Sequence, residues 1–366
     1  MASVKNSSNK NYFRRVQELT PTKFWINNPT REEADIALIE GALGCTCNPS
    51  YCGKMLFDRP EENEYVNRIF NEVIKEANSA TEAEEEMQRR LVSVIAEKFM
   101  PLYKKNPGEN GFVSIQGDPI NEHDPQMIIR EARKNREVSE NICCKIPATE
   151  SGLKAMETLV AENIPINATE VFAVQQALDL CELYEKVSKD SGKHPKFYIS
   201  HITGIYDDYL TEVSKRDNID ISPDILWQAG LSIARKVYKV YSDNNYPVTF
   251  IGGGARGTHH FTEMVGGDVC VTINWKGTAD KLLDENPAVV ERLFNPVPNY
   301  VIEELLDKLP DYRRGYEEGA ISSKEYEDFG PVVKFRNSFV KDWKHVLEEA
   351  DKRLKSKKSN EFSLRV

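Results

Sequence analysis

Short β-rich runs alternate with longer amphipathic stretches along most of the chain. Such alternation indicates a parallel sheet whose strands are connected by helices. Eight strand–helix units are the number found in a closed (β/α)8 barrel. We therefore predict an α/β fold, a (β/α)8 TIM barrel with additional helices, and an open doubly wound sheet is the competing fold. The eight runs occupy residues 23–27, 43–48, 112–117, 142–147, 164–169, 196–202, 247–253 and 269–274.

The same pattern divides the chain into regions. Residues 1–20 are expected to be an N-terminal extension, and residues 21–295 the barrel. Residues 58–104 form an acidic, two-helix excursion between the second and third runs, and that acidity is typical of a solvated face. Residues 296–366 are expected to form a helical C-terminal region packed on the barrel, because they carry an apolar stripe at helical spacing. The stripe comprises Phe335, Phe339, Trp343, Val346, Leu347 and Leu354.

Composition excludes several classes of function. The chain has 366 residues, with 48 Lys and Arg against 58 Asp and Glu, so its net charge is −10. An acidic chain lacks the basic footprint of a nucleic-acid binder, and no run approaches the roughly 18 apolar residues of a membrane span. The N-terminus has no apolar core of a secretory signal. The seven cysteines are an odd number, as expected of reduced thiols. We predict a cytoplasmic enzyme without nucleic-acid or membrane partners.

Two motifs invite cofactor assignments that their context does not support. Cys45, Cys47 and Cys52 match no common zinc spacing. Gly252-x-Gly254-x-x-Gly257 satisfies the dinucleotide fingerprint as a string, but it follows the seventh run and lacks a suitable acidic partner. A barrel anion site suits this glycine loop better. His259 and His260 follow it and are expected to be surface or capping side chains, because adjacent residues diverge on a helix. We predict no metal and no organic cofactor.

The faces of the strands suggest where a site lies. Side chains alternate along a strand, so the apolar positions that face the helices fix which residues point inward. A polar residue points inward near the carboxyl end of run after run, which is where barrel active sites lie. These inward residues are Asn27, Asn48, Gln116, Lys145, Asn167, Thr169 and Ser200.

Lys145 is the sharpest of these signals. The run ICCKIP (142–147) places its amine among apolar neighbours, and burial lowers the pKa of a lysine, as a Schiff-base nucleophile requires. The alternative is a structural lysine that reaches water or pairs with a carboxylate. Asn48 and Asn167 are candidates to hold substrate hydroxyls. Gln116 and Thr169 are candidates to position a water for proton transfer to a carbinolamine.

Three motifs, in this order and spacing, resemble the transaldolase family from about residue 20 to residue 290. They are CNPS (47–50), KIPAT with GLKA (145–149 and 152–155), and NAT with Phe172 and QA (167–169 and 176–177). The resemblance implies a class I, Schiff-base aldolase barrel in which Lys145 attacks a ketose carbonyl. A dihydroxyacetone unit would pass from a ketose or ketose phosphate to an aldehyde acceptor. It implies a transferase of carbohydrate metabolism, in the pentose phosphate pathway, whose partner is a sugar or sugar phosphate. The oligomeric state is left open, with a homodimer as one option.

Several positions differ from the pattern of the transaldolase family, which indicates that the chain resembles a divergent member of it. The family's first-strand Asp, which moves a proton during C–C cleavage, corresponds to Asn27, and its third-strand Glu corresponds to Gln116. Gln at this position resembles the fructose 6-phosphate aldolase branch. Ser200 matches a family serine near the substrate. Arg256 matches one phosphate-binding arginine, whereas the other is replaced by Ile205.

Three functions therefore compete. The first is a transaldolase-like transferase. The second is an aldolase of the fructose 6-phosphate aldolase type acting on a different sugar. The third is a repurposed barrel that binds a sugar without catalysis, for which Asn27 and Ile205 are the best support.

Overall fold

The strands pair side by side in sequence order, each parallel to the next, and β1 pairs with β8 to close the barrel. Closure confirms the (β/α)8 barrel and excludes the open sheet, because an open sheet leaves two unpaired edges. The computed structural model describes residues 10–363, so residues 1–9 of the expected N-terminal extension lie outside it. The strands are β1 (Lys23–Asn27), β2 (Gly44–Cys47), β3 (Val113–Gln116), β4 (Ile142–Pro147), β5 (Ile166–Val171), β6 (Phe197–His201), β7 (Thr249–Gly252) and β8 (Val269–Ile273).

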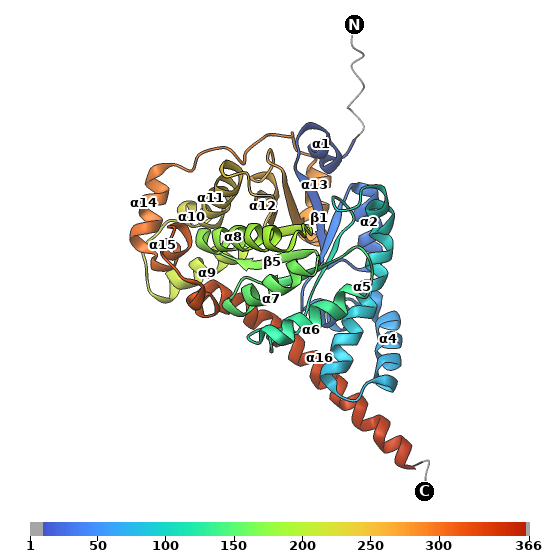
Figure 1. The fold of residues 1–366 in the computed structure, drawn as a ribbon. Helices are drawn as coiled ribbons and strands as arrows, with labels where there is room; N and C mark the ends of the chain where they lie inside the picture. Colours follow the sequence, from blue (N-terminus) through green and yellow to red (C-terminus); the bar gives the residue numbers. More distant parts are fainter. Residues whose placement is uncertain (1–9, 364–366) are drawn as a thin grey trace.

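Helices surround this barrel on all sides (Figure 1). The first half contains α1 (Tyr12–Leu19), α2 (Arg31–Glu40), α3 (Tyr51–Gly53), η1 (Lys54–Asp58), η2 (Pro60–Glu62), α4 (Asn63–Glu76), α5 (Ala80–Lys105), α6 (Pro125–Arg136), α7 (Glu150–Ala161) and α8 (Val174–Ser191). The second half contains α9 (Thr203–Arg216), α10 (Pro223–Leu226), α11 (Ala229–Asp243), α12 (His259–Thr262), η3 (Trp275–Ala279), α13 (Asp280–Glu285), α14 (Asn299–Lys308), α15 (Pro310–Tyr316), η4 (Ser323–Asp328) and α16 (Gly330–Ser363). None of the helices in the described part of the chain is both long and apolar enough to span a bilayer.

Apolar side chains fill the barrel interior one layer below the polar ends of the strands. Trp25, Cys143 and Tyr198 each lie two residues before Asn27, Lys145 and Ser200 respectively, and therefore point to the same face. The rings of Trp25 and Tyr198 meet edge to face at 5.2 Å. The layer closes the barrel from below, so the polar residues above it line its carboxyl end. Its six buried members are Trp25, Phe112, Cys143, Tyr198, Ile251 and Cys270.

The turn from β4 into α7 is held by a close approach. Thr149 caps α7 by accepting a hydrogen bond from the amide of Gly152 at 3.1 Å. A Cβ added to Gly152 would lie 1.8 Å from the carbonyl oxygen of Pro147, so only glycine lets the helix begin this near the strand. This contact fixes the end of β4, which carries Lys145.

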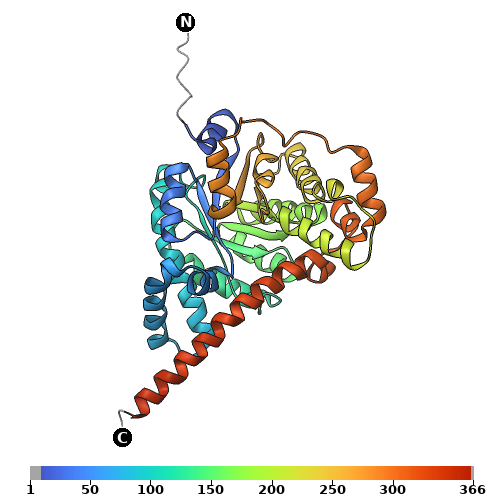
Figure 2. The ribbon, with the colours of Figure 1, turned by 180° about the vertical axis from the view of Figure 1, so that it is seen from behind.

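Helix α16 runs obliquely across one end of the barrel and continues past it alongside α5 and α4 (Figure 2). Its 34 residues span about 50 Å at the rise of an α-helix. Most of the apolar stripe expected from the sequence is buried along it, from Phe335 to Leu354, whereas Leu347 is half-buried. Phe335 and Phe339 are the members that reach the carboxyl end of the barrel.

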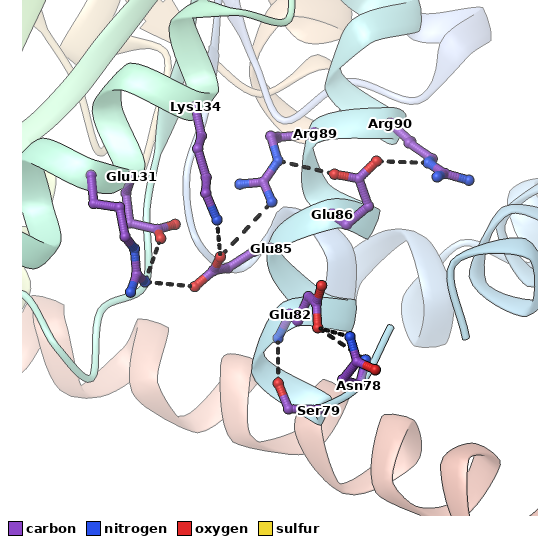
Figure 3. A network of polar contacts seen from close by, with 10 residues as sticks. Asn78, Ser79, Glu82, Glu85, Glu86, Arg89, Arg90, Glu131 and Lys134 are labelled. Carbon is purple, nitrogen blue, oxygen red and sulfur yellow. Dashed lines mark hydrogen bonds and ion pairs between the residues drawn. The ribbon is translucent and has the colours of Figure 1, made fainter. Parts of the chain in front are cut away.

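The excursion consists of η2, α4 and α5, and its acidic side chains are not all solvated. Glu84 and Glu85 of α5 are buried. Figure 3 shows Glu85 between Arg89 and Lys134 of α6, and Arg130 of α6 contacts it at 3.3 Å. Burial, with Glu131 nearby, raises the pKa of Glu85 to about 7. Part of the acidity of the excursion is therefore buried, where Arg130 and Lys134 of α6 join α5 to the barrel.

Candidate active site

A cavity of about 210 Å³ lies at the carboxyl ends of the strands, beneath α16. Residues from β1, β2, β4 and β6 line it from the barrel side, and Phe335, Ser338, Phe339 and Asp342 line it from α16. Five of the residues singled out from the sequence share this cavity: Asn27, Asn48, Lys145, Ser200 and Arg256. Gln116, Asn167 and Thr169 do not line it and are buried behind it.

Lys145 is held in the wall of this cavity by the register of three strands. Gln116 of β3 lies beside Lys145, which lies beside Asn167 of β5. The lysine is only 7% exposed, and its Nζ atom lies 5.8 Å from the centroid of the Phe339 ring. Burial lowers the pKa of Lys145 to about 8, although the nearby Glu170 carboxyl opposes the shift. A usable fraction of the amine is therefore neutral near physiological pH, as nucleophilic attack on a carbonyl requires.

Two polar networks line the barrel end around the lysine. Asn27 donates from Nδ2 to Asn274 Oδ1 at 2.9 Å and accepts from Thr46 Oγ1 at 2.8 Å. Ser200 donates from Oγ to Asn167 Oδ1 at 2.6 Å, and Asn167 in turn donates to Ser114 Oγ at 3.2 Å. These bonds fix the orientation of each amide, so Asn27 and Ser200 offer substrate hydroxyls a preorganised surface.

Asn48 is positioned by Asn28, which follows β1, and by the nearby Ser50. Its Oδ1 atom accepts hydrogen bonds from Asn28 Nδ2 at 2.9 Å and from the amide of Ser50 at 3.1 Å. Because this oxygen already accepts two hydrogen bonds, the amide nitrogen is the group that Asn48 can present to a ligand.

Glu170 is a candidate that the sequence analysis missed. The sequence-predicted strand ends at residue 169, but β5 continues to Val171 and its register with β6 shifts between Ala168 and Val171. This bulge accommodates Glu170 with φ of +61°, a left-handed conformation that is rare for a glutamate. The available signal was an acidic residue inside the apolar run ATEVFAV (168–174).

Glu170 Oε1 accepts a hydrogen bond from Gln116 Nε2 at 3.1 Å. The bond joins β3 to β5 across β4, so the two side chains meet on the face to which Lys145 points. Burial raises the pKa of Glu170 to about 7, against the opposing effects of Gln116, Lys145 and Arg336. A carboxyl group that exchanges protons near neutrality therefore lies beside the buried amine.

Two further cations, Arg256 and Lys54, line the cavity. Arg256 follows β7 in the glycine loop, its side chain is 44% exposed, and it pairs with Asp208. Lys54 of η1 also lines the cavity; burial lowers its pKa, with Asp342 opposing and Arg256 adding to the shift. Gly254 makes the loop's turn with φ of +67°, and a Cβ there would lie 2.6 Å from Ile202. Ile205, where the resemblance places a second arginine, is buried in the lining.

Ligand atoms of Asp207, His259 and His260 lie within 4.8 Å of one another, a spacing that a metal ion could bridge. His260 Nε2 bonds to Asp207 Oδ2 at 2.9 Å, while His260 Nδ1 accepts the amide proton of Arg256 at 3.2 Å. Both ring nitrogens are thus engaged, and His260 caps the Arg256 loop as a buried side chain rather than a surface one. The absence of a metal stays a prediction.

The chain is similar in sequence to known proteins. Residues 24–328 match the family model described as Transaldolase/Fructose-6-phosphate aldolase. A transaldolase from Saccharopolyspora erythraea is 25% identical over 232 residues, which are 60% of this chain and 62% of that protein. A transaldolase from Thiobacillus denitrificans is 21% identical over 340 residues, covering 84% of this chain and 88% of that one.

The match to the Saccharopolyspora protein thus spans less than two thirds of its length. Among solved structures, a 2,3-dimethylmalate lyase covers 80% of this chain and 93% of its own at 11% identity. The TM-score between the two structures is 0.38. The family match covers most of the barrel, including Lys145 and every strand. The chain therefore belongs to the transaldolase/fructose-6-phosphate aldolase family.

Proposed function

We propose that this protein is a Schiff-base transferase that moves a dihydroxyacetone unit from a ketose phosphate to an aldehyde acceptor. The observation that carries the proposal is the nearly buried amine of Lys145, with its lowered pKa, in the wall of a polar cavity. The amine adds to the ketose carbonyl, and the carbinolamine loses water to give an iminium ion. Cleavage of the adjacent C–C bond leaves its electron pair on the enamine and releases an aldehyde, while the adjoining hydroxyl loses its proton.

The enamine then has two fates. Attack on a second aldehyde forms a new C–C bond, and hydrolysis of the resulting imine releases the product ketose. Protonation of the enamine instead leads to free dihydroxyacetone, which is simple aldol cleavage. Gln116 favours this second function, because Gln there resembles the fructose 6-phosphate aldolase branch.

Two cations in the lining of the cavity support a phosphorylated substrate. Arg256 and Lys54 both line the cavity, and Lys54 supplies a second positive charge where Ile205 cannot. Charge-assisted hydrogen bonds from two cations suit a phosphate group. Asn27, Asn48 and Ser200 would then contact the sugar hydroxyls between the phosphate and Lys145.

Product analysis with and without an acceptor tests this proposal. Purified protein is incubated with fructose 6-phosphate alone or together with an aldose phosphate acceptor, and Lys145→Met is run in parallel. Transfer predicts a new ketose only with the acceptor and only in the lysine-containing protein. Free dihydroxyacetone without any acceptor would assign simple cleavage, and equal turnover by Lys145→Met would overturn both. A cytoplasmic location, predicted from the cysteines, and a place in the pentose phosphate pathway, implied by the resemblance, remain predictions.

A further inference from the structure

Glu170 combines three costly features. Its side chain is fully buried, its backbone adopts a left-handed conformation within a strand, and its Oε2 atom has no partner among the described residues. A left-handed conformation is unfavourable for a residue other than glycine, and an unpartnered buried polar atom is unfavourable as well. Strain and unsatisfied polar groups of this kind concentrate at functional sites.

Two residues next to Glu170 also have unpartnered buried oxygen atoms. Gln116 Oε1 and Thr169 Oγ1 are also buried without a partner among the described residues. Gln116 bonds to Glu170 through its other amide atom, and Thr169 precedes Glu170 in the same bulge. Unpartnered oxygen atoms of this kind are the groups that bind a buried water molecule or a reacting hydroxyl group.

Charged groups face Glu170 from several elements. Lys145 of β4 and Arg336 of α16 favour its ionised form, and burial opposes it. Glu122, in the segment after β3, is a second buried carboxyl, and burial and Glu170 both raise the pKa of Glu122 well above its usual range, which favours its neutral form. Glu170 is therefore balanced between its protonated and ionised forms, as a group that both donates and accepts protons requires.

We propose that Glu170 is the acid–base residue that moves protons between the Lys145 nitrogen and the substrate oxygen during Schiff-base formation. The resemblance assigns proton transfer through a water to a third-strand glutamate, and this chain has Gln116 there. The carboxyl group is supplied from β5 instead, and Gln116 orients it. This proposal rests on the proposed Schiff-base function and deepens it.

The proton movements balance over one cycle. Glu170 begins protonated: as the neutral amine adds to the ketose carbonyl, the carboxyl group of Glu170 gives its proton to the new alkoxide, and the resulting carboxylate then takes a proton from nitrogen, giving a neutral carbinolamine and a protonated Glu170. The carboxyl group of Glu170 then donates its proton to the carbinolamine hydroxyl. The C–O bond breaks, water leaves, and the nitrogen lone pair forms the iminium bond. Hydrolysis of the product imine runs the same steps in reverse.

Exchanging the two side chains tests the proposal. Glu170→Gln removes the acid, and we expect the rate of imine formation to fall about 100-fold or more, the range of general acid–base catalysis. Gln116→Glu combined with Glu170→Gln restores a carboxyl–amide pair with its members reversed. We expect this exchange variant to form the imine at least about tenfold faster than Glu170→Gln alone. Glu84→Gln is the matched control, because Glu84 is another fully buried carboxyl, on α5, and burial also raises its pKa.

The pH profile separates acid–base chemistry from a structural role. The wild type should show a bell-shaped rate, rising as Lys145 loses its proton and falling as Glu170 loses its own. Glu170→Gln should retain only the rising limb, which then reports the pKa of Lys145 without the Glu170 charge that raises it. Borohydride trapping of the wild type is measured in parallel, so a wild type that forms no imine contradicts the proposed function rather than the role of Glu170.

Two results overturn the role of Glu170. One is a wild-type rate and an intact falling limb in Glu170→Gln. The other is a folded exchange variant as inactive as Lys145→Met. If Glu170→Gln alone does not fold, the exchange variant, which keeps the paired groups, decides the question by its rate and its pH profile.

Discussion

Replacing Lys145 by methionine should stabilise the folded protein while it abolishes activity. Burial lowers the pKa of this lysine from 10.5 to about 8. One pKa unit corresponds to about 1.36 kcal/mol, so charged Lys145 costs the folded state about 3 kcal/mol at neutral pH. Methionine fills a similar volume without a charge. We therefore expect the free energy of unfolding of Lys145→Met to exceed that of the wild type by up to about 3 kcal/mol.

The sign of the pH dependence follows from proton binding. Between about pH 8 and pH 10.5, Lys145 holds its proton in the unfolded protein but has released it in the folded protein. The free energy of unfolding of the wild type therefore rises with pH in that window. The advantage of Lys145→Met should shrink over the same window. Urea unfolding at neutral pH and near pH 10.5 measures the difference in unfolding free energy between Lys145→Met and the wild type at each pH. The contributions of the other titrating groups cancel in this difference.

Lys154→Met is the matched control, because Lys154 lies on the exposed side of α7, where it pairs with Glu150. It should change stability by less than about 0.5 kcal/mol at either pH. A Lys145→Met protein that is less stable than the wild type at neutral pH, with a gap that does not change with pH, would refute the argument. Lys145 would then be a charged and well-paired structural residue.

Three further substitutions test the other departures from the family. Asn27→Asp supplies a carboxylate that can accept a proton during C–C cleavage, so turnover of a ketose phosphate should rise about tenfold or more in steady-state assays. Unchanged turnover would place Asn27 away from the reacting hydroxyl. Ile205→Arg should lower the KM for phosphorylated over non-phosphorylated ketoses about tenfold, as one charged hydrogen bond allows, and an unchanged ratio would locate the anion elsewhere. Lys54→Met should raise the KM for the same phosphorylated ketose while leaving that for dihydroxyacetone unchanged, and an equal effect on both would remove Lys54 from the anion site.

Much of this site followed from the alternation of side chains along the strands. That rule placed Asn27, Lys145 and Ser200 on the inner face, and all three line the cavity. It works because parallel strands have a fixed period of two, and a buried outer face allows only one register.

Glu170 and Lys54 could not be found in this way. The bulge in β5 breaks the period of two at Glu170, and its left-handed backbone is imposed by the surrounding barrel rather than by its own preference. Lys54 lies in η1, and its place in the cavity depends on the packing of α16 against that end of the barrel. Contacts between segments so far apart in the sequence leave no local pattern.

Borohydride trapping followed by peptide mass analysis tests the central claim most directly. The protein is incubated with dihydroxyacetone, with fructose 6-phosphate and with non-phosphorylated ketoses, reduced, digested and compared with Lys145→Met. The account predicts a reduced adduct on the peptide that contains Lys145 and none in the variant. An adduct on another lysine, or no adduct with a folded wild-type protein that still binds these sugars, would contradict it.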